Sequence, residues 1–203
     1  MVIQCGYHLG LRAKECAGLI LNGKGGLSEL IEQYKKEEKD TSSYPIRTEY
    51  FEYQLKSKYT KGGKSRLLYI PRNMVRDIES YIATERADII ALSKYPEPNG
   101  LLLNAAKSHF GKAISTKHAS TVFRQLKTNV TALKEYHSFH CLRHTFATLL
   151  YDKKIKEGQG KNDAIREVAN ALGHALNKYG DAYKTTVRYI VMRDYMNIVE
   201  KAA

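Results

Sequence analysis

The sequence has little cysteine, no tryptophan and no long apolar run. Its three cysteines, Cys5, Cys16 and Cys141, are an odd number without CxxC spacing. That pattern argues against a disulfide framework or a structural zinc site and predicts buried free thiols. No stretch approaches the roughly 18 apolar residues that cross a bilayer, and residues 1–5 lack the features of a signal peptide. We therefore expect a cytoplasmic protein without a membrane partner.

The chain is strongly basic. Its 203 residues include 33 Lys and Arg against 21 Asp and Glu, a net charge of +12, and the pI is near 9.5. This balance predicts a polyanionic partner. No basic helix has an exposed Trp or Phe face and no lipidation motif is present, so nucleic acid is favoured over a lipid surface.

The local patterns predict a mainly helical α+β domain with a small antiparallel sheet. Short helices are expected over residues 9–21 and 27–39. Period-two alternation over 46–55, a Gly-Gly turn at 60–64 and an apolar run at 66–70 predict a hairpin. Apolar residues then recur at helical spacing in 73–93, 119–133, 139–151, 163–172 and from Val191 onward, with a polar loop at 152–162. No linker divides the chain, so a single domain is expected.

The densest chemical signal is the string HCLRHTFAT at residues 140–148. On a helix His140 and Arg143, three residues apart, would project from the same side toward one ligand. The two-residue pattern by itself arises easily by chance, and its simplest explanation is a solvated helix face. The longer string resembles the second conserved box of the tyrosine recombinases, the phage integrase family, which commonly reads HxLRHTFAT.

Three further segments extend the resemblance in the family's order. Residues 10–12, Gly-Leu-Arg, followed by Glu15, resemble the first box, TGLRxxEL. Leu172-Gly173-His174 matches the family's LGH, and residues 185–189, TTVRY, match its TTxxY nucleophile motif. The resemblance implies the recombinase catalytic-domain fold and a partner of double-stranded DNA. It also implies a homotetramer in which the tail after Tyr189 packs on a neighbouring subunit.

The chemistry of the residues agrees with that resemblance. Attack on a DNA phosphodiester builds negative charge on its nonbridging oxygens, which the forked, permanently charged guanidiniums of Arg12 and Arg143 can stabilise. His140 and His174 can donate to the phosphate or move the nucleophile's proton, because imidazole titrates near neutral pH. Tyr189 would be the nucleophile, which needs nearby cations to favour its deprotonation.

The family also implies supporting residues. A hairpin lysine protonates the leaving 5′ oxygen; Lys61 fits that register, with Lys64 as the alternative. Glu15 would orient the positive groups, and His144 would be a structural neighbour. The phosphotyrosyl link keeps the bond energy and the arginines supply the positive charge, so the reaction is expected to use no ATP, metal or other cofactor.

The chain departs from the family in three places. Tyr189 lies fifteen residues after His174, whereas the usual spacing falls on Tyr183; local context favours Tyr189, and Tyr179 is a third candidate. The interval before His174 is long, through residues 153–162, which could form an extra contacting loop. The helical DNA-clamping domain that precedes the first box is missing. Residues 1–203 are therefore expected to be an excised catalytic domain or a naturally short relative.

The leading interpretation is a site-specific recombinase or integrase of a mobile element, acting in a bacterial or phage-host cytosol at the nucleoid. A type IB topoisomerase or telomere resolvase would use a similar constellation. A third possibility, of another class, is a DNA-binding relative whose catalysis has decayed.

Overall fold

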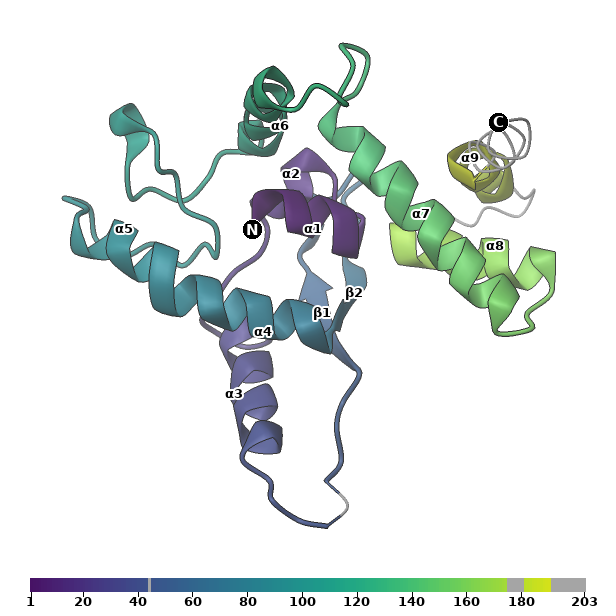
Figure 1. Cartoon of the computed structure of the whole chain (residues 1–203), viewed down its shortest axis with the longest axis horizontal. Coiled ribbons are helices and arrows are strands. Elements are labelled where there is room, and N and C mark those ends of the chain that lie inside the picture. Colours follow the sequence, from purple (N-terminus) through teal and green to yellow (C-terminus); the bar gives the residue numbers. More distant parts are fainter. Residues whose placement is uncertain (44, 175–180, 191–203) are drawn as a thin grey trace.

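The computed structural model describes residues 1–43, 45–174 and 181–190 (Figure 1). Its main elements are α1 (Val2–Leu9), α2 (Ala13–Cys16), α3 (Leu27–Glu38), β1 (Tyr50–Leu55), β2 (Arg66–Pro71), α4 (Arg72–Tyr81), a π-helical turn (Ile82–Arg86), α5 (Ala87–Ala91), α6 (His118–Asn129), α7 (Phe139–Lys156), α8 (Lys161–Leu172) and α9 (Asp181–Ile190), with single 3₁₀ turns at Ser57–Tyr59 and Lys107–His109. The predicted class, mainly helical with a small antiparallel sheet, is confirmed. The expected helix after Val191 lies outside the described residues.

The hairpin lies beside α1 at the centre of the molecule, with α7, α8 and α9 on one side and α4 and α5 on the other (Figure 1). A large core joins α1, α2, α3, α4, α6 and both strands, and it contains the free thiols of Cys5 and Cys16; Cys141 is half-buried. A smaller cluster of Ala147, Val168 and Leu172 joins α7 to α8. In the part of the chain described, no helix is long and apolar enough to cross a membrane.

The strand predicted from residue 46 begins only at Tyr50. Tyr50 pairs with Pro71, the last residue of β2, so residues 46–49 have no strand partner in this antiparallel ladder. Thr48 is instead held by the Glu37 carboxylate of α3, which accepts its backbone N–H at 2.9 Å and its hydroxyl at 2.6 Å. Ile46 is 82% exposed, as a residue outside the packed strand can be.

The helix predicted over residues 9–21 is wrong. Gly10 ends α1 in the left-handed conformation (φ 57°) instead of opening a helix, and Arg12 is extended at the start of the one-turn helix α2. A Cβ on Gly10 would lie 2.4 Å from Cδ1 of Phe146 on α7, so only glycine allows this turn to meet α7. The break lets the Gly10 carbonyl accept a hydrogen bond from Arg143 and lets the Arg12 side chain reach the buried Glu15 carboxylate.

The long loop predicted over residues 152–162 is also wrong. α7 continues to Lys156 and α8 begins at Lys161, which leaves four connecting residues. Lys154 lies 2.9 Å from Glu167 of α8, and this ion pair ties the extended end of α7 to its neighbour. The extra interval in the sequence therefore lengthens a helix and leaves a short connection in place of the long loop.

Candidate active site

Glu15 is a fully buried carboxylate surrounded by three guanidiniums. Its Oε1 lies 2.7 Å from Nη1 of Arg12, and its Oε2 lies 3.1 Å from Nη1 of Arg66 and 3.6 Å from Nη1 of Arg143. Oε2 also accepts the backbone N–H of Arg12 at 2.8 Å, which closes the first turn of α2. Arg12 and Arg143, which are far apart in sequence, are thus brought to one carboxylate. With three positive groups and one negative, the cluster carries an excess of positive charge.

Arg143 is oriented by backbone carbonyls from two elements. Its guanidinium donates to the carbonyl of Gly10 at 2.6 Å and to that of Leu172, the last residue of α8. Burial, reinforced by Arg66 and Arg12, lowers the pKa of Arg143 to about 9, so it stays protonated at neutral pH. Its Nε has no hydrogen-bond partner among the described residues.

Tyr189 lies among three imidazoles. Its hydroxyl is 2.8 Å from Nε2 of His140, and its ring stacks on His144 at 4.0 Å between centroids. The His174 ring is 5.3 Å from the phenol ring. Thr148 of α7 donates to the Tyr189 carbonyl at 3.3 Å, which ties α9 to α7 at this point. The phenol is therefore held beside the two histidines that the family resemblance assigns to phosphate contact or proton transfer.

His174 follows the left-handed Gly173 that ends α8. Its Nδ1 contacts the hydroxyl of buried Thr186 at 2.9 Å, which joins it to α9. Its Nε2 is buried and, within the described ranges, has no hydrogen-bond partner. Buried polar atoms are normally paired. Unused groups at both His174 and Arg143 fit a site made for a hydrogen-bonding anion.

His140 and His174 are both neutral at pH 7, because their pKa values are lowered. Removal from water, followed by the positive charge of Arg143 and Arg12, lowers the pKa of His174 to about 4. For His140, which remains partly exposed, partial desolvation comes first, then His144 and the two arginines, and its pKa also falls to about 4. The arginines thus act electrostatically on both histidines. A phosphate bound there would raise both pKa values, because it adds negative charge.

Lys61 is not part of this cluster. It is exposed on the loop between β1 and β2, as is the alternative Lys64. Of the alternative nucleophiles, Tyr183 lies in α9 but its side chain is outside what the structure describes, and Tyr179 is outside the described residues.

Arg66 is the residue of the cluster that sequence reasoning missed. It begins β2 on the buried face, where the alternation continues with Leu68 and Ile70. A cation in an otherwise apolar, core-facing series was the available signal, because a charge is seldom buried without a partner.

The fold is that of Xer-type recombinases. The chain resembles a structure of the XerH site-specific recombinase in a post-cleavage complex with palindromic difH substrate, with a TM-score of 0.58 and 21% identity over 99% of this chain and 44% of that one. A pre-cleavage XerH complex with difH matches with a TM-score of 0.55 and 22% identity, over 93% and 41% of the two chains.

Sequence relatives agree. The chain is 27% identical to tyrosine recombinase XerC of Listeria welshimeri over 192 residues, which are 94% of this chain and 50% of that protein. It is 30% identical to tyrosine recombinase XerH of Campylobacter jejuni over 115 residues, 57% of this chain and 27% of the relative. It thus spans half or less of their length. The model of the phage integrase family matches residues 28–189, and the chain belongs to that family. Arg12 and Glu15 precede the matched range.

Proposed function

We propose that residues 1–203 act as the catalytic domain of a site-specific DNA recombinase or integrase, which cleaves and rejoins DNA through a 3′-phosphotyrosyl intermediate. The observation that carries the proposal is the 2.8 Å contact between His140 and the Tyr189 hydroxyl beside the arginine cluster on Glu15. Membership of the phage integrase family supports it, as do relatives named tyrosine recombinases and XerH structures that hold a DNA substrate.

The charge of the cluster suits this reaction. Arg12, Arg66 and Arg143 against Glu15 leave a net charge of +2. A phosphodiester carries one negative charge, and attack by a phenolate brings a second into the pentacoordinate transition state. Fixed, preorganised positive charge of that size favours the transition state over the ground state. Glu15 keeps the guanidiniums in place at the cost of one unit of positive charge.

Tyr189 would attack the phosphorus while His140 takes its proton. The phenol oxygen forms the new P–O bond, the bond to the 5′ oxygen breaks, and the proton passes to Nε2 of the neutral His140. His174, with its free Nε2, would hydrogen-bond a nonbridging phosphate oxygen. Each histidine gains basicity as the phosphate arrives, which brings its pKa toward the working pH.

The leaving 5′ oxygen needs a proton, and we assign Lys61 to that role, with Lys64 as the alternative. Both lie on the exposed loop between the strands, a position from which a side chain can reach a DNA groove. Rejoining is the reverse reaction: a 5′ hydroxyl attacks the phosphotyrosine and the phenol leaves. The bond energy is retained and guanidiniums supply the charge stabilisation, so we propose that neither ATP nor a metal ion is required.

Double-stranded DNA would follow a basic surface next to His140. A shallow pocket of about 250 Å³ adjoins it between α6 and the start of α7, and its lining includes Arg124, Lys127 and His137. Cations such as Arg124 and Lys127 can contact phosphates without contacting base edges. We further propose a homotetramer on two duplexes during strand exchange, working in the cytosol at the nucleoid.

Covalent capture tests the proposal. Because the target sequence is unknown, the substrate is a library of nicked duplexes with randomised sequence, in which loss of the short fragment that bears the freed 5′ hydroxyl traps the intermediate. The expected product is a protein–DNA adduct stable to denaturant, with the phosphate mapped to Tyr189 by peptide mass spectrometry. Absence of any adduct would contradict the proposal. Adducts together with relaxation of supercoiled plasmid and no strand exchange would instead indicate a topoisomerase.

A further inference from the structure

Arg66 is a buried cation to which the proposed chemical steps assign no role beyond the net charge of the cluster. Its side chain is 5% exposed. Nη1 donates to Glu15 Oε2 at 3.1 Å and to the carbonyl of Leu172 at 3.0 Å, and Nη2 donates to the carbonyl of Leu9 at 3.1 Å. One planar guanidinium therefore bonds three segments of the chain at once.

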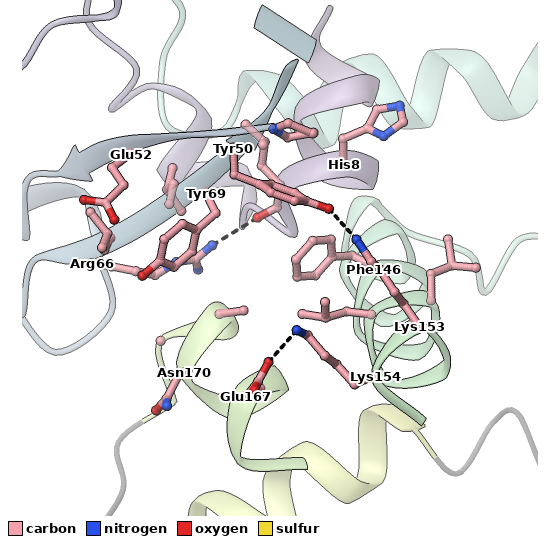
Figure 2. Close-up of a pocket in the computed structure, with 18 of the residues that line it drawn as sticks. His8, Tyr50, Glu52, Arg66, Tyr69, Phe146, Lys153, Lys154, Glu167 and Asn170 are labelled. Carbon is pink, nitrogen blue, oxygen red and sulfur yellow. Dashed lines mark hydrogen bonds and ion pairs between the residues drawn. The ribbon is translucent and has the colours of Figure 1, made fainter. Parts of the chain in front are cut away.

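Those three segments carry the groups that would contact phosphate. Leu9 is the last residue of α1 and Glu15 lies in α2, so Arg66 holds both sides of the short turn that presents Arg12. Leu172 is the last residue of α8, two positions before His174. Figure 2 shows Arg66 across the adjoining pocket from Lys153 and Lys154, which bond to Tyr50 and Glu167 instead.

The surroundings are shaped to admit this side chain. Gly173 is left-handed (φ +63°), and a Cβ there would lie 2.6 Å from Cδ of Arg66. The Leu172 carbonyl also accepts from Arg143, so the end of α8 faces two guanidiniums. That end carries the negative pole of the helix dipole, which favours nearby cations.

We propose that Arg66 is a positioning residue for strand cleavage, an inference that rests on the proposed function. It fixes the Glu15 carboxylate and the end of α8, and so keeps Arg12 and His174 directed at a single phosphate. The fork geometry matters as much as the charge, because a lysine ammonium cannot reach three acceptors in one plane. Arg66 itself needs no contact with DNA.

Arg86 provides a matched control. It is also buried, at 3% exposed, and bonds the carbonyls of Leu101 at 3.2 Å and Pro98 at 2.8 Å together with the Glu97 carboxylate. It lies in the π-helical turn after α4 and makes these bonds outside the Glu15 cluster. Replacing it removes a buried guanidinium of the same kind without touching the proposed site.

The experiment compares Arg66→Lys, Arg66→Met and Arg86→Met in the full 203-residue chain. Single-turnover cleavage of the nicked duplex library is measured per folded molecule, with folding followed by circular dichroism. Nuclear magnetic resonance follows the His174 titration and the Arg12 Nε–H signal. We expect Arg66→Lys to cleave roughly 100-fold more slowly, as for a small misplacement of catalytic groups, and Arg86→Met to cleave at the wild-type rate.

The His174 titration distinguishes the loss of the Arg66 charge from the loss of its hydrogen-bonding geometry. Arg66→Met should raise the His174 midpoint because a positive neighbour is lost, whereas Arg66→Lys keeps the charge and should shift the Arg12 signal with little change in that midpoint. Wild-type cleavage by Arg66→Lys, an equal loss in Arg86→Met, or failure of both Arg66 variants to fold would overturn the inference. If the wild type forms no adduct, the proposed function fails. In that case the Arg12 Nε–H signal alone tests the positioning role of Arg66. An unchanged signal in Arg66→Lys would overturn that role.

Discussion

The Nε2 atom of His140 and the hydroxyl of Tyr189 lie 2.8 Å apart, which joins the first turn of α7 to the last turn of α9. In the sequence, two criteria for the nucleophile disagree. The spacing from His174 favours Tyr183, whereas the local motif favours Tyr189. The contact places an imidazole nitrogen at the Tyr189 hydroxyl and holds the phenol beside the charged cluster. The contact therefore supports the proposal, based on the TTxxY motif, that Tyr189 is the nucleophile.

We expect Tyr189→Phe to abolish the covalent adduct, because it removes only the attacking oxygen. Tyr183→Phe and Tyr179→Phe are the matched controls, and both should still form adducts. The measurement is a denaturing gel of each variant with the nicked duplex library, with duplex binding checked in parallel. An adduct formed by Tyr189→Phe would rule out this nucleophile.

Glu15→Gln should destabilise the fold by about 3 kcal/mol, because removing one member of a buried ionic group leaves the others without compensation. Three guanidiniums would then face one another around a neutral amide. Glu97→Gln is the control: Glu97 also pairs with a buried arginine, Arg86, but its own side chain is 54% exposed. Urea unfolding measures both. Equal losses of unfolding free energy in the two variants would mean that the Glu15 cluster stabilises the fold no more than a solvent-exposed ion pair does.

The stability of the chain should fall on acidification partly through His174. Its pKa is lowered from 6.5 to about 4 in the fold, so between these values the unfolded chain binds a proton that the native chain does not. Stability therefore rises with pH across that window, and the loss is complete below about 4. His174→Gln should show a shallower fall between these limits in urea unfolding.

Inorganic phosphate offers an independent check on the same histidine. Bound near the arginines, it should raise the His174 midpoint in a nuclear magnetic resonance titration. His118 on α6 is the internal control, because burial alone lowers its pKa. Equal movement of both midpoints, or of neither, would contradict an anion site at His174.

Sequence patterns correctly predicted the elements whose formation depends mainly on neighbouring residues. The predicted hairpin forms, although its buried face is Phe51, Tyr53 and Leu55 while Ile46 and Tyr50 are exposed. The charged helix after Leu27 forms with its apolar side inward. Failures occurred where distant residues decide the outcome. Gly10 ends a helix in a left-handed turn that packs against Phe146, far along the chain. Residues 46–49 lack a strand partner because β2 stops at Pro71.

The same distinction applies to the candidate site. Arg12, His140, Arg143, His174 and Tyr189 could be named from motifs, each of which is a short local string. Arg66 could not, because its role is visible only once Leu9, Glu15 and Leu172 are brought together from three elements. Its sole signal was a cation on the buried face of a strand.

Gly173→Ala should slow cleavage well beyond what backbone strain explains. The new methyl would press on Cδ of Arg66 at 2.6 Å, and the residue would also adopt a left-handed conformation that costs alanine about 1 kcal/mol. Gly158→Ala isolates the strain, since Gly158 is also left-handed (φ +87°) and has nothing within 4 Å of the added carbon. Both variants should lose stability, but only Gly173→Ala should cleave more slowly per folded molecule. Similar cleavage by the two would contradict contact with Arg66 as the cause.

DNA affinity should depend on salt through the cations beside His140. Arg124 and Lys127 line the pocket at the start of α7, and each phosphate contact releases counterions from the duplex. Arg124→Gln and Lys127→Gln should each weaken binding and reduce the slope of log affinity against log salt by about 1. Lys35→Gln is the control, because α3 lies at the opposite end of the molecule from α6 (Figure 1) and Lys35 pairs with Glu79. Fluorescence anisotropy with one fixed duplex over a range of potassium chloride measures all three. An unchanged slope for the first two, or an equal change for Lys35→Gln, would place the DNA on another face.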